Sequence, residues 1–159
     1  PSRKHHLTGA GTLCMQLLGQ GQSGEVQQGL QGIKAHEVVS WTEPNGHIYH
    51  WYYDTQAMFH SGGDLWKNWN KMFAPEMVKN QEVITKAIAN LKGDMVDIGY
   101  WDEPGGKGGH CSRMFNTALC ALSLQVYYRY LPSYKPITDD GPAEAAAPAD
   151  KDIEIKIDI

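Results

Sequence analysis

Three segments of this sequence look like versions of one helix. They read GAGTLCMQLLG at residues 9–19, YDTQAMFHSGG at residues 53–63 and FNTALCALSLQ at residues 115–125. Each has a threonine near the start of a run of small and apolar residues, and recurrence at intervals of tens of residues is typical of helical repeat proteins. The sequence therefore predicts an all-α fold whose close-packed inner helices span residues 7–18, 48–61 and 114–131.

The segments between these helices are more polar and predict outer helices. Residues 25–39, EVQQGLQGIKAHEVV, carry a narrow apolar stripe at helical spacing. Residues 63–73 predict another helix, and residues 75–88 predict a further one that begins at Pro75, because proline is favoured in a first helical turn. Glycines crowd residues 91–112, which predicts a long loop before the final helix.

Composition divides the chain into an N-terminal end at residues 1–6, a helical body at 7–132, a linker at 133–151 and a tail at 152–159. The tail, DIEIKIDI, alternates charged residues with isoleucine, which is a strand pattern. It predicts a β-strand that adds to the edge of a partner sheet, with an unanchored chain end as the alternative. The predicted partner-binding residues are Ile153, Ile155, Ile157 and Ile159.

Length and charge narrow the function classes. The chain has 159 residues and a net charge of −4, which suits one domain and gives no basic surface for nucleic acid. It has no apolar run of the roughly 18 residues that a membrane helix needs. Its three cysteines, Cys14, Cys111 and Cys120, do not suggest a disulfide framework. Nothing in the sequence separates a secreted, periplasmic or cytoplasmic location.

Two stretches carry a resemblance to a known superfamily. They are GYWDEPGGKGGHCSRMFNTALCALSLQVYYRYLP at residues 99–132, and YHWYYDTQAMFHSGG at residues 49–63 followed by WKNWN. Over residues 7–132 the chain resembles the α/α toroid of squalene cyclases and protein prenyltransferases, and in particular uncharacterised bacterial proteins with prenyltransferase or squalene oxidase repeats. A closed toroid of this kind has about a dozen helices, so the resemblance implies a partial toroid.

The same resemblance argues against inherited chemistry. Squalene cyclases use a DxDD acid motif, and the chain has none. In prenyltransferases a D-x-C motif and a histidine hold zinc; here Asp54 matches the aspartate, but Gln56 replaces the cysteine and Asn116 the histidine. The resemblance thus implies a non-catalytic structural or protein-interaction module, completed by a protein partner or by the remainder of the same polypeptide. The alternative is a terpenoid-cyclase-like or prenyltransferase-like enzyme whose acidic motif lies elsewhere.

One constellation has the spacing of metal ligands. His47, His50 and Asp54 lie at i, i+3 and i+7, so His50 and Asp54 share a helix face, and His60 or His110 could complete a zinc shell. The alternative interpretation is a carboxylate that fixes a histidine tautomer.

Aromatic side chains surround this constellation. Together with Trp101, the neighbouring Tyr49, Tyr52 and Tyr53 would suit a cavity for an apolar, isoprenoid-like or cationic ligand. Ordinary helix packing explains the same residues.

Overall fold

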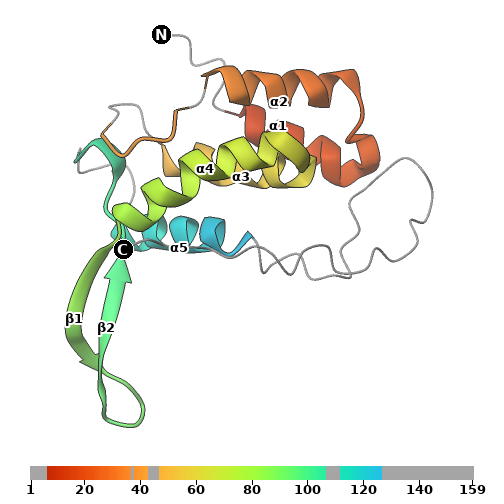
Figure 1. The fold of residues 1–159 in the computed structure, drawn as a ribbon. Coiled ribbons are helices and arrows are strands. Elements are labelled where there is room, and N and C mark those ends of the chain that lie inside the picture. Colours follow the sequence, from red (N-terminus) through yellow and green to blue (C-terminus); the bar gives the residue numbers. More distant parts are fainter. Residues whose placement is uncertain (1–6, 37, 43–46, 107–111, 127–159) are drawn as a thin grey trace.

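The computed structural model describes residues 7–36, 38–42, 47–106 and 112–126 (Figure 1). In chain order the helices are α1 (Thr8–Met15), a π-helical segment (Gln16–Gln20), α2 (Gly24–His36), α3 (Ile48–Ser61), α4 (Gly63–Lys79), a 3-10 turn (Pro104–Gly106) and α5 (Arg113–Leu124). Two antiparallel strands, β1 (Glu82–Ala89) and β2 (Met95–Tyr100), lie between α4 and the 3-10 turn. The predicted strand at residues 152–159 lies outside the described residues.

The three helices predicted from the recurring segments pack in one row. α1 packs on α3, and α3 packs on α5, whereas α2 packs on α1 and α4 packs on α3. We call α1, α3 and α5 the central row, and α2 and α4 the flanking helices. The predicted helix at residues 48–61 is confirmed at both ends as Ile48–Ser61, while the first is α-helical over Thr8–Met15 and continues as a π-helix over Gln16–Gln20. The fold is mainly helical, as predicted.

The hairpin of β1 and β2 contradicts the prediction of an all-α body. Residues 75–88 were expected to form one helix; instead α4 continues through Pro75 as far as Lys79, and β1 follows. Residues 91–112 were expected to form a loop, but residues 95–100 form β2.

The side chains of the hairpin explain this correction. Val83, Ile84 and Thr85 are β-branched, and residues of this kind favour strands over helices. The turn between the strands is a tight one, in which Asn90 Oδ1 accepts hydrogen bonds from the backbone N–H groups of Lys92 at 2.8 Å and Asp94 at 3.0 Å. Gly93, at φ +88°, supplies the left-handed conformation that the turn requires. The strand signal was therefore present in the sequence.

Two of the three recurring threonines accept hydrogen bonds from tryptophans of the core. Thr55 is fully buried and accepts a hydrogen bond from Trp69 Nε1 at 3.0 Å, which joins α3 to α4. Thr117 Oγ1 accepts from the backbone N–H of Trp101 at 3.1 Å, and Trp101 Nε1 donates to the Met77 carbonyl oxygen at 2.8 Å. Trp101 therefore fixes the base of the hairpin to both α4 and α5.

Glycines set the distance between α1 and its two neighbours. A Cβ added at Gly9 would lie 2.8 Å from the backbone nitrogen of Asp54 on α3 and would overlap the Asp54 carboxylate. A Cβ added at Gly29 on α2 would overlap Thr12 Oγ1 on α1. Because backbone atoms cannot move aside as a flexible side chain can, Gly9 fixes the closest approach in the central row.

Replacing Gly9 by alanine should therefore separate α1 from α3. We expect Gly9→Ala to lower the free energy of unfolding by about 1–3 kcal/mol, the usual effect of overpacking a core. Gly11 lies on the same helix with no atom near its missing Cβ, so Gly11→Ala should leave stability unchanged or raise it by up to about 1 kcal/mol. Urea unfolding followed by circular dichroism compares the two, and equal stabilities of the two variants would contradict the close approach.

Candidate functional site

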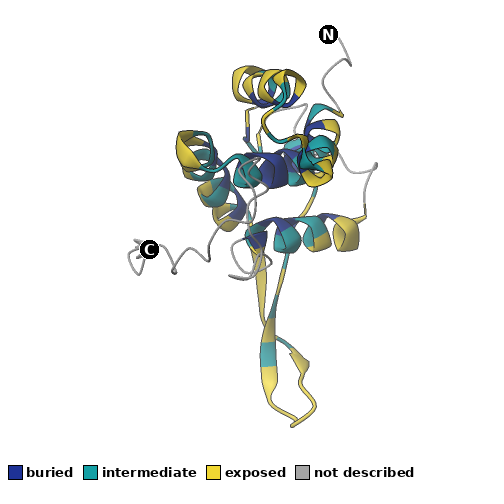
Figure 2. Ribbon diagram, turned by 90° about the vertical axis from the view of Figure 1, so that its right-hand side faces the viewer, coloured by how far each residue is buried: buried dark blue, intermediate teal, exposed yellow. Residues whose placement is uncertain are grey.

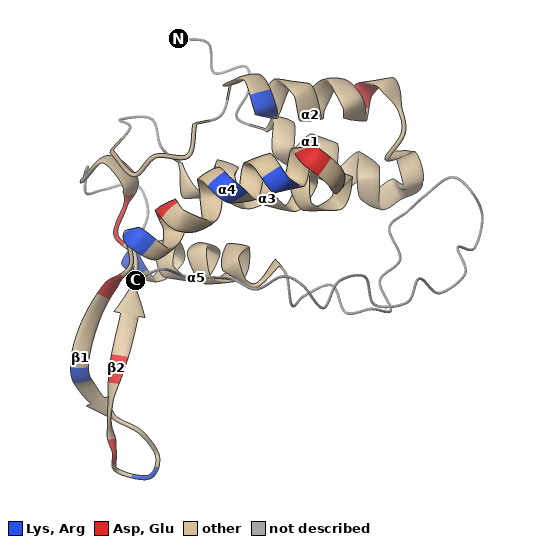
Figure 3. Cartoon of the chain, viewed as in Figure 1, with Lys and Arg blue, Asp and Glu red and all other residues tan. Residues whose placement is uncertain are grey.

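The central row presents a surface that is almost free of charge. Its three helices carry only Asp54, which is 3% exposed, and Arg113, at the first residue of α5. The two flanking helices carry many more charged side chains, as Figure 3 shows: Glu25, Lys34, Asp64, Lys67, Lys71, Glu76 and Lys79. Helix faces that contact water normally carry charged side chains. The difference in charge therefore indicates that the flanking helices, and not the central row, are adapted to solvent.

Large apolar side chains nevertheless lie exposed at the ends of the central row. Leu18, just beyond α1, is 79% exposed, and Met114 on α5 is 81% exposed. Leu7, which precedes α1, is 67% exposed. An uncharged surface with exposed apolar side chains is typical of a contact face for another protein surface.

Three of the predicted ligand-lining aromatics come together on α3. The ring centroids of Tyr49 and Tyr53 are 4.9 Å apart, and those of Tyr52 and Tyr53 are 5.0 Å apart. A hydrogen bond with Tyr49, followed by burial, raises the pKa of Tyr53, and Cys14 of α1 lies near enough to contribute. The tyrosines therefore continue the surface of α1 across α3.

Trp101, the fourth predicted lining residue, lies apart from the tyrosines. It is 4% exposed and belongs to the hydrophobic core, where its indole binds Met77. Its position is that of a brace for the hairpin base.

The predicted metal ligands are brought together only in part. The rings of His47 and His50 have centroids 4.7 Å apart and are tilted by 32° to one another, while Asp54 is buried where α1 approaches α3. His110 lies outside the described residues. Within the described ranges, no group of three histidine, cysteine, aspartate or glutamate side chains is placed to hold a metal ion.

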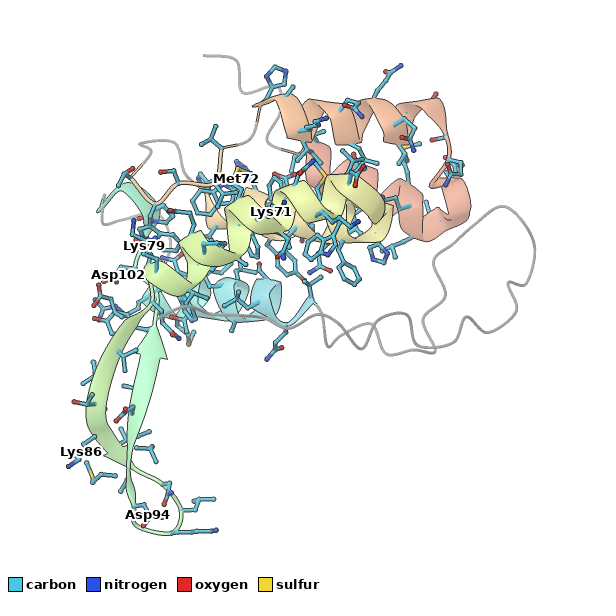
Figure 4. All side chains as sticks on the ribbon, viewed as in Figure 1. Lys71, Met72, Lys79, Lys86, Asp94 and Asp102 are labelled. Carbon is cyan, nitrogen blue, oxygen red and sulfur yellow. The ribbon has the colours of Figure 1, made fainter. Side chains whose placement is uncertain are left out.

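The hairpin carries a second apolar surface, which the sequence analysis missed. In the register of the strands Ile84 faces Ile98 and Ile88 faces Val96, so these four side chains share one face. Ile84 is 47% exposed and Ile88 is 52% exposed. Figure 2 shows most of the hairpin as exposed, and in Figure 4 the labelled Lys86 and Asp94 lie far from the helices.

A salt bridge and an aromatic contact hold the hairpin base to α5. Arg113 Nε lies 2.7 Å from Asp102 Oδ1, and the guanidinium carbon lies 4.2 Å from the centre of the Tyr100 ring. Both charged side chains are more than half exposed, so the ion pair contributes little to the free energy of folding. Its main effect is on the orientation of the hairpin base relative to α5.

One cavity lies where the π-helical segment meets the end of α3 and the start of α4. Its volume is about 270 Å³, and Gln16, Gln27, His60 and Ser61 supply polar lining. Burial lowers the pKa of His60 from its ordinary value of 6.5, which keeps the imidazole neutral at neutral pH. Gln16 was missed in the sequence because it stands within an apolar helical run, yet a lone polar residue in such a run is a signal that can be read.

Comparison with known proteins adds no relative: no family model, curated protein or solved structure matches the chain. Among the described residues, no helix has both the length and the apolar character needed to cross a membrane.

The lowered pKa of His60 predicts how stability depends on pH. The unfolded chain takes up a proton at this histidine near pH 6.5, before the folded chain does, so stability should fall as the pH drops below that value. We expect His60→Gln, which cannot take up this proton, to lose less stability between pH 7.5 and pH 5.5. Urea unfolding across this range measures both proteins. Parallel curves for the two proteins would contradict a partly buried, neutral His60.

Proposed function

We propose that the chain is a non-catalytic structural and protein-interaction module, built on part of an α/α toroid, whose central row packs against a further protein surface. That surface belongs to the remainder of the same polypeptide or to another subunit. The supporting observation is the uncharged, partly exposed apolar surface of α1, α3 and α5, beside flanking helices that carry the charge.

The arrangement of the helices suits a toroid segment. In such a segment the inner helices pack on one another and each outer helix packs on an inner one. The central row would supply the inner helices, and α2 and α4 the outer ones. Each repeat of such a fold covers the apolar face of its neighbour, so a partial set leaves apolar surface uncovered.

Two residues stand where the resemblance to prenyltransferases would place zinc ligands, and their chemistry supports a module that does not bind zinc in this way. Gln56 and Asn116 are each 2% exposed and have neutral amide side chains. Thiolate, imidazole and carboxylate are the ligands of a tetrahedral zinc site, and neutral amides are poor substitutes for them.

The proposal predicts that the isolated chain associates through its central row. Size-exclusion chromatography with light scattering should show self-association that rises with concentration, together with binding of an apolar dye such as ANS. Replacing Leu18 and Met114 by glutamine should reduce both effects, because these side chains are 79% and 81% exposed there.

Leu91 provides the matched control for this experiment. It is a highly exposed leucine that lies in the hairpin turn, away from the central row. Leu91→Gln should leave association and dye binding as in the unmodified chain. A monomer that binds no dye, or an equal effect of the Leu91 change, would contradict the proposed contact face.

A further inference from the structure

The cavity at the π-helical segment has the features of a binding site that is separate from the contact face. It lies between the segment Gln16–Gln20, the start of α2, the end of α3 and the start of α4. Short π-helical segments interrupt the regular hydrogen bonding of a helix and occur frequently at functional sites. Here Gly19, at φ +83°, allows the chain to turn at the end of that segment.

Gln16 supplies a buried acceptor in this cavity. The residue is 6% exposed, and its Nε2 donates a hydrogen bond to the Ala57 carbonyl oxygen at 3.1 Å. The Ala57 carbonyl oxygen can only accept, so the atom of Gln16 that faces it must be the amide nitrogen. The other amide atom, Oε1, is therefore an acceptor. In the part of the chain that the structure describes, Gln16 Oε1 is buried without a hydrogen-bond partner. Leaving such an atom unpaired costs about 1–3 kcal/mol, so a donor is expected there.

The other lining residues define the chemistry of the donor. None of the cavity's lining side chains carries a formal charge when His60 is neutral. Ser61 Oγ donates to the Met58 carbonyl oxygen at 2.6 Å, so its lone pairs remain to accept. Gln27 Nε2 donates to the Gly21 carbonyl oxygen at 3.3 Å, which leaves its own carbonyl oxygen as an acceptor. Leu65, which is partly buried, adds an apolar side chain to the same cavity, and Leu30 also lines it but is only 1% exposed.

We propose that this cavity binds a small, uncharged polyhydroxylated molecule of about monosaccharide size. Hydroxyl groups can donate to Gln16 Oε1 and to the other acceptors, while the C–H face of a sugar ring packs on Leu65. A charged ligand is disfavoured, because a charge taken out of water without a partner of opposite sign costs several kcal/mol. A volume of about 270 Å³ lies just below the roughly 300–1,000 Å³ of sites for drug-sized ligands, which favours a single ring.

Ligand-observed NMR on the full 159-residue chain tests this proposal. The probes are D-glucose, D-galactose, D-mannose and myo-inositol at pH 7.5, with D-glucose 6-phosphate as the charged comparator. At least one uncharged probe should bind, and the phosphorylated sugar should bind more weakly than glucose. If none of the uncharged probes binds, the cavity holds water only and the proposal is wrong. Stronger binding of the phosphorylated sugar would also overturn it.

Variants locate the site. Gln16→Met should weaken binding of the best probe by ~10-fold, the effect of one lost hydrogen bond to a buried acceptor. Gln16→Met also removes the hydrogen bond to the Ala57 carbonyl oxygen, so this variant could bind weakly because it is less stable. A second pair of variants, at exposed positions, avoids this problem. Gln27→Ala removes an exposed lining glutamine of α2, and Gln28→Ala removes its exposed neighbour, which does not line the cavity. Weaker binding for Gln27→Ala alone supports the site, and equal affinities for the two variants would overturn it.

Discussion

The close approach of α1 to α3 is the constraint on which the rest of the fold depends. It is possible because Gly9 has no side chain at the point where α1 meets the backbone of Asp54. The same helix also packs on α2, where Gly29 lies against Thr12. With both contacts made through glycine, α1 packs closely on both neighbours and has little freedom to shift.

A second set of contacts places the hairpin. Trp101 directly follows the second strand and donates hydrogen bonds to α4 through its indole and to α5 through its backbone N–H. A two-stranded hairpin is only marginally stable in water by itself, so these bonds at its base matter for its position. The apolar pairs farther along the strands, Ile84 with Ile98 and Ile88 with Val96, lack the cover that the base has. The chain thus has two apolar surfaces, one on the central row and one on the hairpin, and different contacts hold each of them in place.

Sequence reasoning located the helices well for a physical reason. The runs around Thr12, Thr55 and Thr117 combine small residues with apolar ones, and this pattern both forms helices and lets them pack closely. It failed at the hairpin, where Pro75 was read as the start of a helix although α4 passes through it. The prediction of a helix over residues 75–88 rested on Pro75 and overlooked the β-branched run that begins at Val83, which favours a strand.

The candidate sites were harder to predict, because they depend on which residues meet in space. Sequence spacing brought together His47 with His50, and Tyr49 with Tyr53, as neighbours on one helix. It could not show that α1 would cover Asp54, since that contact joins segments far apart in the chain. The cavity at Gln16 likewise needs four separate segments to meet, and no single motif records it.

The central claim is that the uncharged face of α1, α3 and α5 is a contact surface. Hydroxyl-radical footprinting of the isolated chain, compared with the same residues in the natural assembly, tests it most directly. The account predicts that Leu18 and Met114, at 79% and 81% exposed, are labelled in the isolated chain and protected in the assembly. Val78, on the outside of α4 and 50% exposed, should be labelled in both. Equal labelling of Leu18 and Met114 in the two samples would contradict the claim.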